Sequence, residues 1–267
     1  MSKIMDLMNL KGRRALITGA TGHIGLVLSQ TLAELGAEVI LVDRPGSEFS
    51  STISDVRRAS SGTATAFECD LELQADRDRL MEHLKREPAG LDILVNNAAF
   101  VGTSDLEGWI GDLQRQTTAC WRRALEVNLT AAFDLCRGLA PLLIRSGHGS
   151  IVNIASIYGF CGPDHSLYQG TAMGNPAAYG VSKGGLIQLT RWLSTTLAPS
   201  VRVNCISPGG VARGQAEEFV RRYELRTPLG RMATEDDLRG AIAYLASDLS
   251  AYCTGHNLVV DGGWSAW

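Results

Sequence analysis

The sequence predicts an α/β protein with a doubly wound sheet of about seven parallel strands, helices on both faces and a single domain. Apolar runs of strand length alternate along the chain with amphipathic stretches of helix length. Repeated strand–helix–strand units predict a parallel sheet, because each crossover helix returns the chain to the same end of the sheet. The 267 residues, 45% of them hydrophobic, suffice for one large core, and no linker or low-complexity tract divides residues 1–267.

Seven apolar runs are the expected strands: 15–18, 38–42, 64–68, 91–95, 150–155, 201–206 and 257–260. The stretch after the first run has helical period, and Gly36 is expected to end that helix. Two segments, 101–117 and 158–178, interrupt the alternation after the fourth and fifth strands. Because open α/β sheets bind ligands at the carboxyl ends of their strands, both segments are expected to line a substrate site, with ordinary surface loops as the alternative.

The composition excludes several classes of partner. The charge sum of 25 basic and 28 acidic residues is −3, so no overall positive field would hold nucleic acid or an anionic membrane. Six cysteines and five histidines show no zinc-ligand spacing, so no metal site is expected. The N-terminus lacks a secretory pattern and no run approaches 18 apolar residues, which favours a reducing, cytoplasmic location with free thiols.

A glycine-rich turn follows the first strand and opens a helix, as in Rossmann-like dinucleotide-binding folds. Backbone N–H groups of such a turn approach a pyrophosphate closely. Asp43 closes the second strand, where a carboxylate accepts hydrogen bonds from both ribose hydroxyls and repels a 2′-phosphate, which favours NAD. Arg44 would instead pair with a 2′-phosphate, so NADP remains the alternative. The residues of the turn expected to contact the cofactor are Gly19, Thr21, Gly22, His23, Ile24 and Gly25.

Asp70 follows the third strand and is expected to receive the adenine amino group, with Leu71 beside it. An aspartate at the end of a strand is also a common helix N-cap, and one residue can do both.

A Tyr179-x-x-x-Lys183 pair predicts the chemistry. Asn175 is expected to cap its helix with Pro176 at the first helical position, so that Tyr179 and Lys183 share one helix face. The free pKa of tyrosine is about 10, and a cation one turn away stabilises the phenolate and lowers that pKa. Such a pair passes a proton to or from a substrate oxygen while hydride moves to or from a nicotinamide.

Two further residues accompany this pair. Ser156 ends the fifth strand, where its hydroxyl would hold the substrate oxygen. Asn128 is expected on the preceding helix, and its alternative role is that of a buried amide that satisfies the backbone.

The chain resembles the short-chain dehydrogenase/reductase family over nearly its whole length. The motifs that carry the resemblance are Thr18 to Gly25, Asp70-Leu71, Asn96 to Ala99, Asn128, Ser156, Tyr179/Lys183 and Ser207 to Val211. The resemblance implies a catalytic tetrad in which Tyr179 is the acid/base, Lys183 lowers its pKa and binds the nicotinamide ribose, Ser156 positions the substrate oxygen and Asn128 helps hold a relay water. It also implies that Asn97, Ala98 and Ala99 line the cofactor, that Pro208, Gly209 and Val211 flank the nicotinamide, and that the enzyme is a homotetramer or homodimer.

The sequence departs from the family pattern at several positions. His23 replaces a usual glycine, which is tolerable if its φ is negative, and Ala99 replaces another. Arg213 replaces a usual threonine, which removes a carboxamide contact and places a cation near the substrate. The 23 positions from Ser156 to Tyr179 exceed the usual spacing. The added polar segment, 161–175, suits a hydroxyl-rich substrate such as a sugar or sugar derivative.

The residues from Tyr168 to Met173, with the TPLGRMA and VVDGGW segments, are similar to the branch of the family associated with bacterial flagellin modification and sugar pathways. Residues 210–227 are expected to form a lid near the cofactor, in which Arg221, Arg222 and Arg226 meet an anionic substrate or face water. Trp264 and Trp267 are expected at a subunit interface or near a neighbouring site.

The sequence therefore predicts an NAD(P)-dependent oxidoreductase that interconverts a secondary alcohol and a ketone in a small-molecule substrate. Residues 180–184 also match a G-x-S-x-G nucleophile elbow, but that elbow needs a preceding strand and a helix is expected here. A dinucleotide-binding sensor or scaffold without turnover is the second alternative, and the intact tetrad argues against it.

Overall fold

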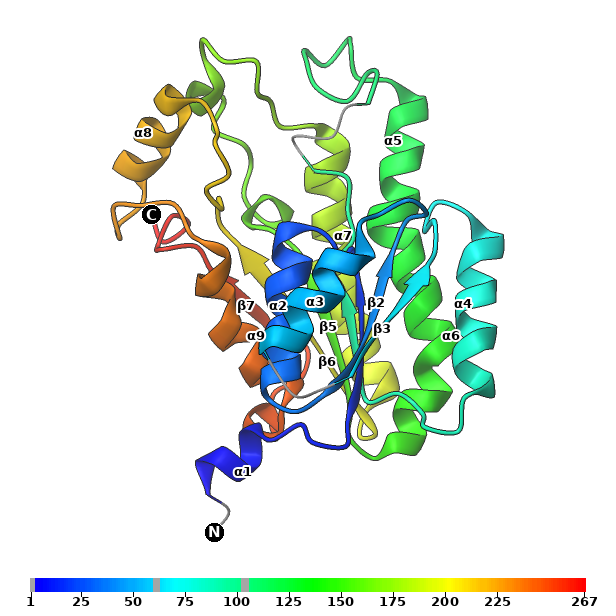
Figure 1. Cartoon of the computed structure of the whole chain (residues 1–267). Coiled ribbons are helices and arrows are strands. Elements are labelled where there is room, and N and C mark those ends of the chain that lie inside the picture. Colours follow the sequence, from blue (N-terminus) through cyan, green and yellow to red (C-terminus); the bar gives the residue numbers. More distant parts are fainter. Residues whose placement is uncertain (1–2, 60–62, 102–105) are drawn as a thin grey trace.

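The computed structural model describes residues 3–59, 63–101 and 106–267. One sheet of seven parallel strands has the order β3-β2-β1-β4-β5-β6-β7 (Figure 1). The strands are β1 (Arg14–Thr18), β2 (Glu38–Asp43), β3 (Ala64–Glu68), β4 (Ile93–Asn96), β5 (Gly149–Ile154), β6 (Val201–Pro208) and β7 (Asn257–Val260). The predicted strands and parallel topology are confirmed, with ends that differ by at most two residues. The strand order reverses between β1 and β4, which is where doubly wound sheets open a ligand crevice.

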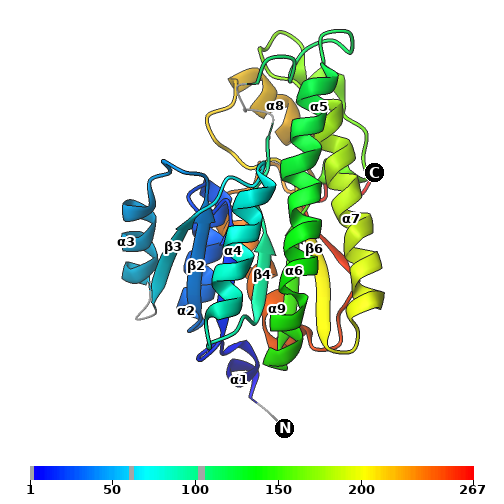
Figure 2. The ribbon, with the colours of Figure 1, turned by 90° about the vertical axis from the view of Figure 1, so that its right-hand side faces the viewer.

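Helices cover both faces of the sheet (Figure 2). They are α1 (Ile4–Met8), α2 (His23–Glu34), α3 (Phe49–Ala59), α4 (Gln74–Arg86), α5 (Thr118–Leu125), α6 (Ala131–Ser146), α7 (Ala177–Leu197), α8 (Glu217–Arg226) and α9 (Arg239–Ala246). The helices α2, α3 and α9 pack on one face, and α4, α6 and α7 on the other. Gly36 follows α2 with a φ of +103°, so it ends this helix as predicted.

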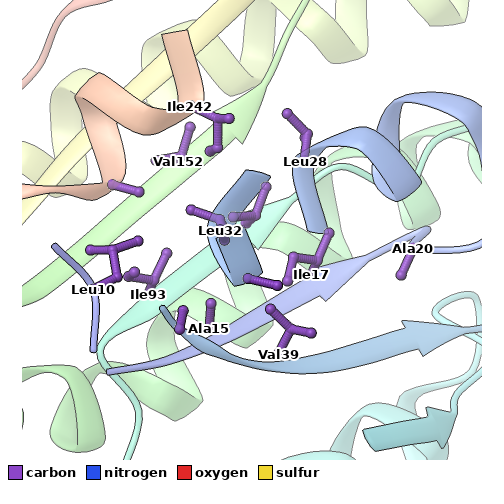
Figure 3. Close-up of a cluster of buried hydrophobic side chains, with 14 of the residues drawn as sticks. Leu10, Ala15, Ile17, Ala20, Leu28, Leu32, Val39, Ile93, Val152 and Ile242 are labelled. Carbon is purple, nitrogen blue, oxygen red and sulfur yellow. The ribbon is translucent and has the colours of Figure 1, made fainter. Parts of the chain in front are cut away.

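The two-residue period of each strand divides the core between the faces. Leu28 and Leu32 of α2, Ile242 of α9 and Ile17 of β1 belong to one buried cluster, in which Ile242 lies beside Val152 of β5 (Figure 3). Leu16, the preceding residue, points to the opposite face and joins the cluster under α4 and α6. Because both faces of the central strands are buried, these strands are largely apolar and present only their ends to ligands.

One continuous helical run extends through α5, a π-helical turn over Glu126–Thr130 and α6. By length and composition alone, this run could cross a membrane. It reaches that length because three helical segments are joined end to end. More than half of its most apolar window is buried inside the chain, where α6 packs on the sheet. Burial in the core therefore accounts for its composition.

A buried arginine ties α4 to this run. Arg77 Nε lies 3.1 Å from Asp134 Oδ2 of α6, and Nη2 lies 2.6 Å from Glu126 Oε1 of the π-helical turn. Its Nη1 donates to the carbonyl of Leu71. Only 2% of the Arg77 side chain is exposed, so this cluster fixes the turn that carries Asn128 from inside the protein.

One predicted helix start is wrong, and the alternative capping role of Asp70 is not found. The helix α4 begins at Gln74 rather than beside Asp70, whose Oδ1 accepts from Glu72 N at 3.0 Å in a local turn. The helix α7 begins at Ala177 with Pro176 as its N-cap, one residue later than predicted. The reason is that the Asn175 side chain donates to the Tyr168 hydroxyl at 3.4 Å instead of capping the helix.

Candidate active site

The glycine turn between β1 and α2 is packed so tightly that side chains are excluded from two positions. A Cβ at Gly25 would lie 2.0 Å from the Gly19 carbonyl oxygen. Gly19 has a φ of +64°, and a Cβ there would lie 2.8 Å from Ala98 Cα. His23 is the first residue of α2, and no non-glycine residue in the described ranges has a positive φ, so the condition for its side chain is met. The turn thus leaves backbone N–H groups and a helix N-terminus open to a phosphate.

Asp43 lies beside this turn, as predicted. Its Oδ2 accepts hydrogen bonds from Thr21 N at 3.0 Å and from Thr21 Oγ1 at 2.7 Å. Its Oδ1 accepts from Arg44 N at 2.9 Å. The carboxylate at the end of β2 is therefore held against the turn, where the ribose next to a bound diphosphate would meet it.

The end of β4 is fastened to the same turn. Asn97 N and Ala98 N donate to Thr18 Oγ1 at 3.0 and 3.1 Å. Asn97 Nδ2 donates to the carbonyls of Thr18 and Gly19 at 2.9 and 3.0 Å. The Thr18 hydroxyl, to which sequence reasoning gave no role, thus anchors the segment that continues to Ala99.

The other predicted cofactor residues lie near the carboxyl ends of the strands, and they differ in burial and in backbone contacts. Leu71 is buried in the core, and Asp70 above it is half-buried. Pro208 ends β6, Gly209 N donates to the Val260 carbonyl at 2.9 Å, and Val211 bridges to Ala233. The residues Gly22 and Ile24 belong to the turn and the first turn of α2, and Ala99 follows β4.

The helix α7 and the end of β5 bring the catalytic candidates together. Lys183 Nζ donates to the Ile154 carbonyl at 2.7 Å and lies 5.8 Å from the centroid of the Tyr179 ring. Ser156 follows β5, and its hydroxyl acts to lower the pKa of the Tyr179 phenol, so the two side chains are neighbours. The predicted juxtaposition of Ser156, Tyr179 and Lys183 is therefore present.

The sequence predicted a lowered pKa for Tyr179, and for the protein without a bound ligand this prediction is wrong. Burial raises the pKa of Tyr179 above its ordinary value, although the Ser156 hydroxyl and the Arg213 charge act in the lowering direction. Burial also lowers the pKa of Lys183 to about 8. Because both groups are pushed toward their neutral forms, Tyr179 holds its proton at neutral pH.

Asn128 lies in the π-helical turn and is 1% exposed. Its Oδ1 accepts from Phe100 N at 2.7 Å, and its Nδ2 donates to Phe100 O at 3.2 Å and to Ser182 Oγ at 3.0 Å. The alternative role, a buried amide that satisfies the backbone, is confirmed. Asn128 thereby joins the loop after β4 to α7.

The long segment between Ser156 and Tyr179 brings two further tyrosines to the site. The hydroxyls of Tyr158 and Tyr168 are 2.9 Å apart, and Tyr158 N donates to Ser156 Oγ at 3.2 Å. Tyr168 also influences the pKa of Tyr179, so the two phenols are neighbours. Sequence reasoning noted Tyr168 but missed Tyr158, whose only signal was its position two residues after Ser156.

The described part of the first insertion also packs beside Tyr179. Trp109 is buried and donates its Nε1 to the Val101 carbonyl at 2.7 Å. It lies in an apolar cluster with Ala178 and Tyr179 and lines a hollow of about 250 Å³ with Trp121. Residues 102–105 of the predicted 101–117 segment lie outside the described residues.

The helix α8 in the predicted lid holds the second insertion. Arg222 donates to the carbonyls of Ser166, Leu167 and Gln169, and Arg226 pairs with Asp164. The insertion therefore uses Arg222 and Arg226, although 40% of the Arg226 side chain stays exposed. Arg221 is exposed to water, and an anionic substrate for these arginines stays a prediction.

Trp264 is 2% exposed and stacks on Tyr223 of α8 with 5.9 Å between ring centroids. The chain itself buries this side chain, whereas the expected place of the C-terminal segment at a subunit interface stays a prediction. Trp267 is exposed and donates to the Arg226 carbonyl at 3.2 Å.

Comparisons with known proteins agree with this arrangement. The family model for enoyl-(acyl carrier protein) reductase matches residues 19–265. The 3-oxoacyl-[acyl-carrier-protein] reductase FabG of Aquifex aeolicus is 30% identical over 96% of this chain and 98% of its own.

Two solved structures are similar in fold and sequence. A protein described as an NAD(P)-dependent gluconate 5-dehydrogenase from Beutenbergia cavernae, with bound NADP, has a TM-score of 0.85 and 32% identity over 98% of this chain and 100% of its own. A short-chain dehydrogenase from Leptospira borgpetersenii with bound NAD⁺ has a TM-score of 0.83 and 30% identity over 99% and 96%. The flagellin-modification branch stays a prediction. The site geometry and these matches together show that the chain belongs to the short-chain dehydrogenase/reductase family.

Proposed function

We propose that the chain is an NAD(P)-dependent oxidoreductase that interconverts a secondary alcohol and a ketone, with NAD as the preferred cofactor. The observation that carries the proposal is the convergence of Ser156, Tyr179 and Lys183. It is joined by the glycine turn, where a Cβ at Gly19 or Gly25 would clash with backbone atoms. The neighbours that bind NAD⁺ or NADP support a dinucleotide in that turn without choosing between them. The hydrogen-bonded carboxylate of Asp43 favours NAD.

The residues present fit this cofactor. The turn from Gly19 to Gly25 would hold the diphosphate, Asp43 the adenosine ribose, and Lys183 the nicotinamide ribose. When bound, the cofactor supplies the hydride acceptor or donor.

The chain itself handles the proton. In ketone reduction the Tyr179 Oη–H bond breaks and its proton passes to the substrate oxygen, which Ser156 holds by a hydrogen bond. In alcohol oxidation the phenolate of Tyr179 takes the hydroxyl proton. Because burial raises the pKa of Tyr179, the phenol form is abundant at neutral pH, and oxidation is expected to accelerate as the pH rises.

We further propose a hydroxyl-rich substrate of the sugar class. Tyr168 is a neighbour of Tyr179, and it contacts the Tyr158 hydroxyl and the Asn175 amide. These groups match substrate hydroxyls better than an acyl chain. The similarity to a gluconate 5-dehydrogenase supports this class, and the similarity to carrier-protein reductases supports a 3-oxoacyl substrate instead.

Tyr168→Phe tests the substrate class. We expect it to raise KM for aldonates and polyols about tenfold, because a hydrogen bond to the substrate is lost, and to leave KM for cyclohexanol unchanged. The measurement is steady-state kinetics with a panel of aldonates, polyols, simple secondary alcohols and acetoacetyl thioesters. Turnover confined to the thioesters, with no effect of Tyr168→Phe, would contradict the sugar class.

We also propose that the chain forms a homotetramer or homodimer and that it is cytoplasmic. Four apolar side chains on α6 and α7 are substantially exposed: Phe133, Ile144, Val181 and Trp192. A second copy of the chain would cover them.

A further inference from the structure

Three charged or polar side chains that the proposed chemistry does not use meet between the glycine turn and the end of β6. Arg213 Nε lies 3.2 Å from Glu235 Oε1. His23 Nδ1, on the first residue of α2, lies 4.0 Å from the same oxygen. The side chains of Arg213 and Glu235 are 28% and 24% exposed, so this ion pair is partly sheltered from solvent.

The backbone fixes this meeting point. The segment after β6 pairs with residue 233, because Ala212 N donates to Ala233 O at 2.8 Å and Ala233 N donates to Gly210 O at 2.9 Å. Gln215 adds a brace: its Oε1 accepts from Arg213 N at 2.6 Å, and its Nε2 donates to Val211 O at 2.7 Å. Glu235 begins the 3₁₀ turn Glu235–Leu238, two residues after Ala233. Arg213 and Glu235 are therefore held on two tethered segments.

The cluster of Arg213, Glu235 and His23 lies where the proposed cofactor would bind. The glycine turn would hold the diphosphate, and Val211 would flank the nicotinamide. Arg213 follows Val211 by two residues and pairs with Glu235 beside the turn, so it would lie near the atoms that join the two. Glu235 places a carboxylate beside the first residue of α2, where a helix N-terminus favours a negative charge. The protein thus already accommodates an anion near the phosphate-binding turn.

Arg213 retains free donors. Only its Nε and its backbone N–H donate within the described residues, and Nη1 and Nη2 have no hydrogen-bond partner there. A planar guanidinium with two free terminal nitrogens is suited to paired hydrogen bonds with phosphate oxygens. The Arg213 charge also acts on the Tyr179 phenol, so the two side chains are within electrostatic reach of each other.

We propose that Arg213 is a diphosphate-binding residue of this chain and that Glu235 is a carboxylate that competes with the diphosphate for Arg213. The inference rests on the proposed function, since it requires a dinucleotide in the glycine turn. It assigns a binding role to the position where the family usually has a threonine. Two substitutions should then act in opposite directions, because one removes the cation and the other removes its competitor.

The test is isothermal titration with ADP-ribose, which carries the diphosphate, and with AMP, which lacks the second phosphate. Arg213→Gln is expected to weaken ADP-ribose binding at least tenfold and to flatten its salt dependence, with AMP binding nearly unchanged. Arg213→Lys should retain part of the affinity, and Glu235→Gln should tighten ADP-ribose binding. Arg221→Gln, which removes an exposed arginine of α8, is the matched control and should leave binding unchanged.

Equal ADP-ribose affinity in Arg213→Gln and the unmodified chain would overturn this inference while leaving the proposed function intact. The same holds if Arg213→Gln instead raises KM for aldonates and spares the matching uncharged polyols, because Arg213 would then serve a substrate carboxylate. Failure of the unmodified chain to bind ADP-ribose would refute the proposed function itself. Far-UV circular dichroism of each variant separates these results from misfolding.

Discussion

Replacement of Tyr179 by phenylalanine is expected to lower turnover by about 10²–10⁴-fold, which is the usual contribution of a positioned acid or base. The hydroxyl near Ser156 is the group that exchanges the proton with the substrate oxygen, and phenylalanine keeps the ring beside Lys183 but cannot exchange a proton. The affinity for NADH should change little, since the glycine turn and Asp43 are untouched.

The measurement compares kcat and NADH affinity in the unmodified chain, Tyr179→Phe and Tyr252→Phe. Tyr252 is fully exposed, so its variant controls for the loss of a phenol elsewhere on the protein. A Tyr179→Phe variant with near-normal kcat would show that another group carries the proton.

Replacement of Arg77 by methionine is expected to reduce the free energy of unfolding by about 3–5 kcal/mol, the range found when one partner of a buried ion pair is removed. The substitution leaves the buried Asp134 without its contact to Arg77, and Glu126 and the Leu71 carbonyl each lose a donor. The π-helical turn that carries Asn128 loses its tether to α4, so activity should fall as well.

Chemical denaturation of Arg77→Met and of Arg79→Met checks this prediction. Arg79 lies on the same helix and pairs with Asp76, but 57% of its side chain is exposed, so its loss should change stability by only about 0.5 kcal/mol. If the two variants are equally stable, the buried cluster does not hold α4 to the π-helical turn.

The fold was predictable because strand identity depends on local composition. Each apolar run became a strand, and the central strands are apolar because both of their faces are buried. Helix starts were less predictable, because they depend on partners distant in sequence or in an insertion. Asn175 shows this: its amide is used by Tyr168, so Pro176 takes the cap position.

The sequence predicted which residues meet in the site but not the direction in which the pKa of Tyr179 shifts. Tyr179, Lys183 and Ser156 meet because strand ends and one helix face place them together. The direction of the Tyr179 pKa shift depends on burial by the insertions, and no pattern in the sequence reports that. The contact between Tyr158 and Tyr168, and the use of Arg222 by three carbonyls, likewise require the folded insertion.

The central claim, a nicotinamide dinucleotide bound at the glycine turn with Asp43 as its selector, is tested most directly by isothermal titration of the chain with NADH and NADPH. The expected result is that NADH binds at least tenfold tighter than NADPH, a difference of about 1.4 kcal/mol. In Asp43→Ala this difference should become smaller, because the protein no longer offers a carboxylate to the ribose of NADH. A preference for NADPH would contradict the role of Asp43 as selector and would indicate that Arg44 binds the 2′-phosphate. Absence of binding for both dinucleotides would contradict the account as a whole.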